Sequence, residues 1–203
     1  MDIQTRRRFI EITKRRIKPG SGSTALFLTT RTWTNPVTNL NDLITVPYVI
    51  VDGVATRLYR PERMTLDLGI LIHYSQAERL YQNLRTKAIL IGELSIGGTS
   101  WELPDKTVLN ILTDDRPWID RALAQPRMSP DGQPVIDLPY LILMKLAASR
   151  TTDISDISRM LGQANDENLE RVRKIIEVYD RESLEDLESL IQLGKLEFDG
   201  HSR

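Results

Sequence analysis

The sequence contains no cysteine and only two histidines, His73 and His201. The missing thiols exclude disulfide bonds, thiolate metal sites and cysteine nucleophiles, and they fit a reducing compartment. Two imidazoles are too few for a zinc centre built from several histidines. Any metal is therefore expected to be a hard cation held by carboxylates.

Long apolar runs are absent as well. No segment approaches the about 20 apolar residues that a membrane-spanning helix needs. The basic residues among the first eighteen are not followed by the apolar stretch of a secretory signal. We therefore expect a cytoplasmic protein with no membrane association. A formal net charge of -1 argues against a globally cationic nucleic-acid binder.

The composition is that of a globular protein, with 40% hydrophobic and 27% charged residues in a chain of 203. This length suits one substantial domain with a smaller one appended. The pattern predicts three parts: a basic N-terminal helix and irregular segment over 1–45, an α/β core over 46–134, and a C-terminal helical subdomain over 135–203.

The N-terminal part begins with Ile3, Ile10 and Ile17 at heptad spacing, which predicts an amphipathic helix over 2–18 with a basic outer face. Two roles are open for that face: it is solvated, or it contacts the phosphates of RNA. Residues 24–45 mix Thr, Asn and Pro, and we interpret them as irregular.

The core alternates apolar runs with helical patterns, and the C-terminal part is helical throughout. Strands are predicted at 48–51, 66–72, 95–103, 107–112 and 134–136. Helices are predicted at 54–59, 75–86, 117–125, 140–148, 153–161, 167–179 and 183–193. The fold class is therefore α/β (α+β), with a mixed sheet, flanking helices and a C-terminal helical subdomain.

Two segments carry a family resemblance. Tyr48–Ala55 and Arg63–Ile70 resemble the signature of the nucleotidyltransferase superfamily, especially its AbiEii-type toxin branch. In that family a strand ends in Gly-Gly or Gly-Ser before a helix. The next strand opens with Arg-x-Thr-x-Asp-apolar-Asp. Downstream, Leu138–Arg150 followed by Asp153–Ile157 is similar to that family's Lys-containing helix and the acidic helix after it. Together these matches span residues 46–162.

The resemblance implies a nucleotidyl transfer from a nucleoside triphosphate to RNA or protein, assisted by Mg²⁺, and an antitoxin or a paralogous protein as partner. It makes Asp67 the catalytic, metal-binding carboxylate. The nucleotide-binding residues that it implies are Gly53, Arg63, Thr65 and Lys145. Carboxylates two apart on a strand share one face and can hold the same ions.

Three positions depart from the family pattern. Gly69 stands where the second carboxylate is expected, and Asp52 replaces a glycine or serine and brings negative charge to the place of the triphosphate. Asn110 stands at the third carboxylate. Asp114 and Glu102 are the candidates to replace a missing metal ligand.

These departures favour weakened or lost catalysis. A non-catalytic binding or regulatory module on the same fold is the alternative. Lys145 also has two interpretations, because a lysine on a helix can contact phosphate or pair with acidic neighbours. For Arg150, Asp153 and Asp156 we favour a structural polar network that fixes two helices.

Overall fold

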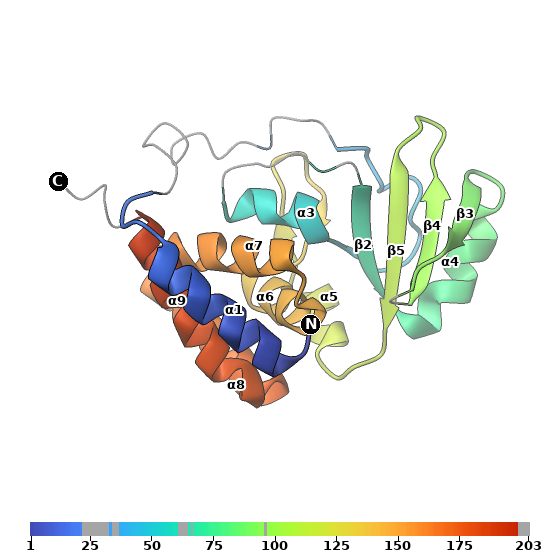
Figure 1. Cartoon of the computed structure of the whole chain (residues 1–203). Coiled ribbons are helices and arrows are strands. Elements are labelled where there is room, and N and C mark those ends of the chain that lie inside the picture. The colour runs from blue at the N-terminus through green and yellow to red at the C-terminus, as the bar shows by residue number, and fades with distance from the viewer. Residues whose placement is uncertain (22–32, 34–36, 61–64, 66, 96, 199–203) are drawn as a thin grey trace. The chain divides into compact units, whose positions relative to one another are not determined.

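The computed structural model describes residues 1–21, 33, 37–60, 65, 67–95 and 97–198 (Figure 1). They form two compact units. The sheet unit contains all seven strands. The helical unit contains the N-terminal helix, Tyr59, Arg60 and the chain from Leu138 onward. The chain passes from the sheet unit to the helical unit after Asp137.

The sheet unit is built on one mixed sheet with the order β3-β4-β5-β2-β1-β7-β6. β2 runs parallel to β5 and antiparallel to β1, and β1 runs parallel to β7. The two edges are antiparallel hairpins, β3 with β4 and β6 with β7. The strands are β1 (Val49–Val51), β2 (Asp67–His73), β3 (Ile89–Glu93), β4 (Gly98–Glu102), β5 (Val108–Asp114), β6 (Arg127–Met128) and β7 (Pro134–Val135).

The helices of this unit are short. α3 (Asp52–Ala55) follows β1 directly and continues as a 3₁₀ turn, η1 (Thr56–Leu58). After β2, a second 3₁₀ turn, η2 (Tyr74–Gln76), leads into α4 (Ala77–Leu84). α5 (Ile119–Ala124) follows β5.

The two faces of the sheet differ in polarity. One face is apolar: Leu68, Leu109 and Trp101 lie in a single row across β2, β5 and β4, and all three are buried. α4 adds Leu80 to this core, and Tyr81 packs its ring 6.0 Å from the ring of Trp101. The opposite face, called the polar face below, carries Asp67, Asn110 and Glu102, because successive strand residues point to opposite sides. Buried Leu71 and Leu112 share this face further along β2 and β5.

The described residues of the helical unit form five α-helices. They are α1 (Ile3–Arg16), α6 (Leu138–Ala148), α7 (Thr151–Gly162), α8 (Asp166–Tyr179) and α9 (Leu184–Phe198), with the 3₁₀ turn η3 (Arg181–Ser183) before α9. α7 and α9 cross closely at two glycines, because a Cβ on Gly194 would overlap the carbonyl oxygen of Ser158 and one on Gly162 would overlap the backbone of Gly194.

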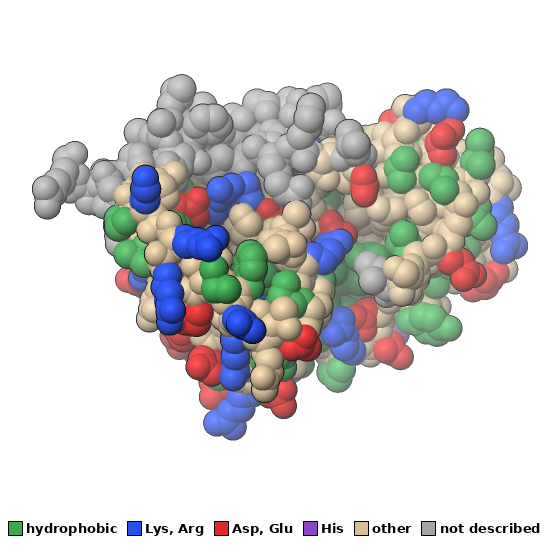
Figure 2. All heavy atoms as spheres, viewed as in Figure 1, with side chains coloured by type: hydrophobic (Ala, Val, Ile, Leu, Met, Phe, Trp, Pro, Cys, Tyr) green, Lys and Arg blue, Asp and Glu red, His purple; other side chains and the backbone are tan. Residues whose placement is uncertain are grey.

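Arg6 attaches α1 to this unit. Its Nε donates to Asp186 Oδ2 at 2.6 Å, and its Nη1 donates to Leu146 O and to Ser149 Oγ at 2.8 Å each. Nη2 donates to Ser183 Oγ at 2.8 Å. The guanidinium is buried, and each of its three nitrogens donates a hydrogen bond. The remaining Lys and Arg side chains of α1 face the surface (Figure 2).

The predicted fold class is confirmed: a mixed α/β sheet with flanking helices is followed by a helical segment. Two strands were missed, β3 and β6, and α6 begins at Leu138 rather than at 140. Most of the segment predicted as irregular, 24–45, lies outside the described residues. Among the described residues, no helix has both the length and the apolar character to cross a membrane.

Candidate functional site

The residues of the first motif meet on the polar face of the sheet. Asp67 is the first residue of β2 and is exposed. Gly69, two residues later on the same face, pairs with Val51 on β1 and with Asn110 on β5. Asp52 follows Val51 directly. The ends of β1 and β2 and the middle of β5 therefore bring Asp52, Asp67 and Asn110 to one place.

The side chain of Asp52 fills the space beside Gly69. A Cβ on Gly69 would lie 2.9 Å from Asp52 Oδ2 and 3.3 Å from Val51 Cγ2. Asp52 reaches this position with a φ of 55°, a left-handed conformation that is uncommon for a residue other than glycine. The Asp52 side chain therefore occupies the space that a side chain at residue 69 would enter.

Asp67 lies beside this position. It is two residues before Gly69 on the same face of β2, and side chains two apart on a strand are separated by about 7 Å. Asn110 Nδ2 donates to Asp67 Oδ2 in a long hydrogen bond of 3.4 Å. The asparagine therefore orients Asp67 with one end of its amide, and the site combines two acidic side chains with one neutral amide.

A metal ion has few protein ligands here. Within the part of the chain that the structure describes, no three acidic or histidine side chains gather closely enough to hold a metal. Mg²⁺ commonly needs only one or two carboxylates, because waters and substrate phosphates complete its octahedron. Asp52 and Asp67 fit that requirement, and they fit it only together with a phosphate substrate.

Glu102 lies on the same face but is engaged elsewhere. It pairs with Val108 across β4 and β5, and Val108 pairs with Asp67, so Glu102 lies two strands from Asp67. Its Oε1 accepts a hydrogen bond from Lys106 Nζ at 2.6 Å.

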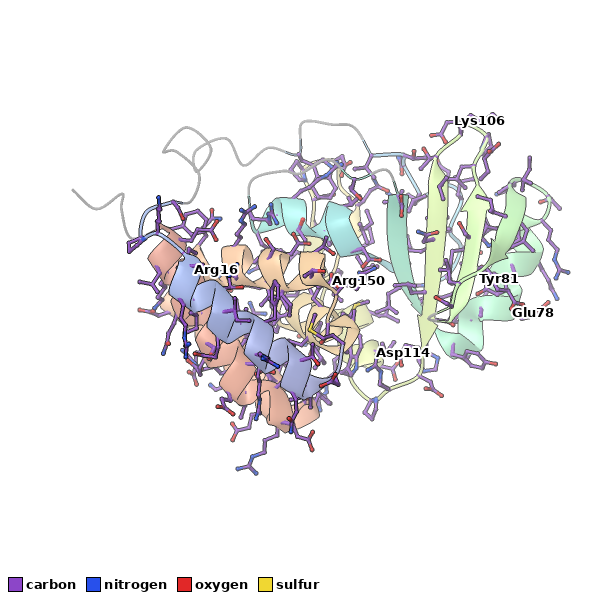
Figure 3. All side chains as sticks on the ribbon, viewed as in Figure 1. Arg16, Glu78, Tyr81, Lys106, Asp114 and Arg150 are labelled. Carbon is purple, nitrogen blue, oxygen red and sulfur yellow. The ribbon has the colours of Figure 1, made fainter. Side chains whose placement is uncertain are left out.

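Asp114 is not brought to Asp67. It pairs with His73 at the far end of β2, six register positions from Asp67, or about 20 Å. Figure 3 shows Lys106 and Asp114 at opposite ends of β5. Arg116 donates to the Asp114 carboxylate through its backbone N–H and its guanidinium. Burial would raise the pKa of Asp114, but these hydrogen bonds outweigh burial and hold it below 3.8.

Lys145 is buried in the helical unit between two carboxylates. Its Nζ donates to Asp153 Oδ1 at 2.8 Å and to Asp156 Oδ2 at 2.9 Å, and all three side chains are at most 3% exposed. Arg60 adds an ion pair to Asp156, and Arg150 Nε donates to Asp153 Oδ2 at 2.6 Å. The ammonium group predicted to contact phosphate is occupied by this network, which joins α6 to α7.

The other residues predicted to bind nucleotide are Gly53, Thr65 and Arg63. Gly53 is buried in α3, and its carbonyl accepts a hydrogen bond from Thr56 Oγ1 at 2.7 Å. Thr65 is half-buried in the segment before β2. Arg63 lies outside the described residues.

The contact between the Asp52 side chain and the space beside Gly69 was not predicted from the sequence. We expected the charge of Asp52 to lie where a triphosphate would bind, and the structure places its carboxylate beside Gly69. The available signal was that residues 52 and 69 both depart from the motif that the sequence resembles.

Comparison with known proteins gives only a distant likeness. No protein-family model and no curated protein matches the sequence. Among solved structures, ANT(2″)-Ia in complex with adenylyl-2″-tobramycin is 18% identical over 72% of this chain and 87% of the other, with a TM-score of 0.41. A solution structure of the antibiotic-resistance factor ANT(2″)-Ia is 16% identical over 77% and 87%, with a TM-score of 0.39. Overlaps this loose carry no conclusion about the activity of this chain.

Proposed function

We propose that the polar face of the sheet unit is a metal-dependent nucleotidyl-transfer site in which Asp52 replaces the second carboxylate of the motif. The observation that supports this most directly is the position of the Asp52 carboxylate in the space that a side chain at residue 69 would enter. Mg²⁺ is commonly held by one or two carboxylates together with substrate phosphates, so Asp52 and Asp67 would supply enough protein ligands.

Each side chain has a distinct task in this proposal. Asp52 and Asp67 bind the cation, and Asn110 holds the Asp67 carboxylate through its amide. Mg²⁺, when bound, would neutralise charge on the phosphate oxygens. The acceptor hydroxyl then loses its proton to solvent and forms a bond to the α-phosphorus, the bond from that phosphorus to the bridging oxygen breaks, and pyrophosphate leaves.

The substrates come from the sequence resemblance. A nucleoside triphosphate is the donor, and RNA or a protein hydroxyl is the acceptor. Membership of the AbiEii-type branch and an antitoxin or paralogous partner remain predictions of that resemblance. Lys145 has no assigned role in substrate binding in this proposal, because its ammonium is held by Asp153 and Asp156.

One observation favours the alternative, a non-catalytic binding module. The described residues place only two carboxylates and one amide at this site, and no third carboxylate is near enough to complete a metal cluster. Such a site could bind a metal–nucleotide complex without turning it over.

The test is transfer of label from α-labelled nucleoside triphosphates to bulk RNA and to cell proteins, with Mg²⁺ or Mn²⁺. Asp52→Asn and Asp67→Asn are each expected to lower transfer by about 100-fold or more, since each removes a charged ligand. Asp115→Asn, an exposed aspartate in the same unit, is the matched control and should leave transfer unchanged.

A position swap makes the test specific for the role of Asp52. Gly69→Asp alone should lower transfer, because its side chain would collide with Asp52. The double variant Asp52→Gly plus Gly69→Asp moves the carboxylate to β2 and should recover transfer, since glycine tolerates the left-handed φ at residue 52. A wild type and a double variant that are both silent would contradict catalysis and favour the binding module.

A further inference from the structure

The proposed site leaves part of the negative charge of its substrates unbalanced. A Mg²⁺ ion cancels only part of the charge of a nucleoside triphosphate, and RNA carries a negative charge at each phosphate. Lys145, which the sequence resemblance assigned to phosphate, is held by Asp153 and Asp156 in the helical unit. A cationic side chain on the polar face of the sheet unit would therefore stabilise either substrate beside Asp52 and Asp67.

Strand register places Lys106 at this face. Asp67 pairs with Val108 on β5, and Val108 pairs with Glu102 on β4, so these three residues form one row across the sheet. Neighbouring strands are about 4.8 Å apart, which puts the Cα atoms of Asp67 and Glu102 about 10 Å apart. Lys106 Nζ donates to Glu102 Oε1 at 2.6 Å. A nucleotide bound at Asp67 is long enough to reach this ammonium group.

The turn between β4 and β5 fixes the backbone of Lys106. Lys106 N donates to Leu103 O and Leu103 N donates to Thr107 O, both at 2.9 Å, so two backbone hydrogen bonds close the turn. Within it, Thr107 N donates to Asp105 Oδ1 at 3.0 Å. Because the turn is ordered before any ligand binds, a contact from Lys106 costs less conformational entropy.

The ammonium group of Lys106 is charged and accessible. Its hydrogen bond to Glu102 and the negative charge of Glu102 raise the pKa of Lys106 above the ordinary value of 10.5, so the side chain is a cation at neutral pH. The side chain is 77% exposed. An ammonium group has three donors, and exposed ion pairs contribute little to stability. The pair with Glu102 therefore leaves Lys106 able to contact a phosphate.

We propose that Lys106 binds a phosphate group of the substrate on the polar face. The phosphate belongs to the nucleoside triphosphate or to the backbone of an RNA acceptor, and the contact is a charge-assisted hydrogen bond in both cases. The inference rests on the proposed function, because a metal ion at Asp52 and Asp67 is what brings the phosphates to this face. It adds a binding residue that lies outside the sequence motif.

The experiment measures binding rather than transfer, so it does not depend on catalysis. Isothermal titration calorimetry with the α,β-methylene analogues of ATP, GTP, CTP and UTP in Mg²⁺ tests the donor. Fluorescence anisotropy with a labelled single-stranded RNA of mixed sequence tests the acceptor. Lys106→Met should raise the dissociation constant of one of these probes by about fivefold to tenfold, and Lys106→Arg should keep most of the affinity. If the probe is RNA, the slope of log K against log salt should fall by about 0.7, the value for one phosphate contact on a single strand.

Lys174→Met is the matched control. Lys174 lies on α8 in the helical unit, is 70% exposed and pairs with Glu170 four residues before it, as Lys106 pairs with Glu102. Its loss should leave both affinities unchanged. An equal loss of affinity in Lys174→Met would show a general effect of net charge and would overturn the inference.

The remaining outcomes separate this inference from the proposed activity. The probe that loses affinity in Lys106→Met identifies the source of the phosphate. A Lys106→Met variant that binds both probes as the wild type does would overturn the inference and leave the proposed activity standing. A wild type that binds neither probe would overturn both. Binding that depends on Lys106 without any transfer of label would support the inference and contradict the proposed activity alone.

Discussion

Replacing Lys145 by methionine tests whether this residue is part of the fold rather than a contact to substrate. The side chain is 3% exposed, and its ammonium bridges Asp153 and Asp156. Methionine keeps much of the volume but removes the charge. Of the three cationic side chains in this network, the two buried carboxylates would then keep the guanidinium groups of Arg60 and Arg150.

The expected loss in the free energy of unfolding follows from removing one partner of a buried ion pair. Removing one partner of such a pair typically costs about 3–5 kcal/mol, because the remaining charge is left without compensation. Arg60 and Arg150 reduce that penalty, so we expect about 3 kcal/mol. With a urea dependence of about 2 kcal/mol per M, the midpoint of unfolding should fall by about 1.5 M.

The assay is urea unfolding followed by far-UV circular dichroism, which reports the helices. Tryptophan fluorescence provides a second probe, because Trp33, Trp101 and Trp118 all belong to the sheet unit. Lys195→Met is the control: Lys195 is exposed on α9, and its loss should change stability by less than about 0.5 kcal/mol.

The refuting result is a Lys145→Met variant that unfolds like the wild type but has lost nucleotide binding. It would show that the network contributes little to stability and that the lysine serves a ligand, as the sequence resemblance implied. A destabilised variant that keeps its transfer activity at low temperature would support the structural role.

Three further predictions follow from the packing and the titrating groups. Gly194→Ala should destabilise the chain by about 2 kcal/mol or more in urea unfolding, because its methyl group would overlap the Ser158 carbonyl where α7 crosses α9. Burial alone would raise the pKa of Asp153, but hydrogen bonds and charge from Arg150 and Lys145 lower it from the ordinary value of 3.8. The ionised Asp153 therefore contributes stability above pH 3.8, and urea unfolding should show that this contribution is lost as the pH falls below that value. Burial and the charge of Asp131 raise the pKa of Tyr48 to about 12. In an ultraviolet titration that compares the wild type with Tyr48→Phe, Tyr48 should therefore ionise well above its ordinary pKa of 10, and the stability that depends on its neutral form should be lost as the pH rises from 10 toward 12.

Helices with strong periodicity were predictable from sequence because their signals are local. The isoleucine spacing in 2–18 and the apolar pattern of 167–179 correspond to α1 and α8 within a few residues at each end. The attachment of α1 to the helical unit was not predictable. It depends on Asp186 accepting from Arg6 across 180 residues of sequence, and no local pattern records that contact.

The strand β3 was missed for a related reason. Ile89–Glu93 is five residues long and follows the last turn after α4, so its apolar residues gave no clear period. Its strand conformation depends on pairing with β4, which includes a bulge between Leu90 and Gly92. A short edge strand forms because it pairs with a neighbouring strand, and a local sequence pattern does not contain information about that neighbour.

The site shows both the strength and the limit of motif comparison. The placement of Asn110 beside the first motif followed from strand register, and the structure pairs it with Gly69. The departures at Asp52 and Gly69 each counted as a loss when compared position by position. In the structure the two positions are linked, because a side chain at residue 69 and the side chain of Asp52 would compete for the same volume.

The competition between these two side chains for one volume also predicts how substitutions at residues 52 and 69 combine. If Asp52 occupies the volume that a residue 69 side chain needs, the two positions cannot both be acidic without displacing one carboxylate. The two single changes, Asp52→Gly and Gly69→Asp, should then be strongly non-additive, with the double variant closer to wild type than either alone. Additive losses would mean that Asp52 and residue 69 act on separate features, and the proposal that one carboxylate has moved from β2 to the end of β1 would fail.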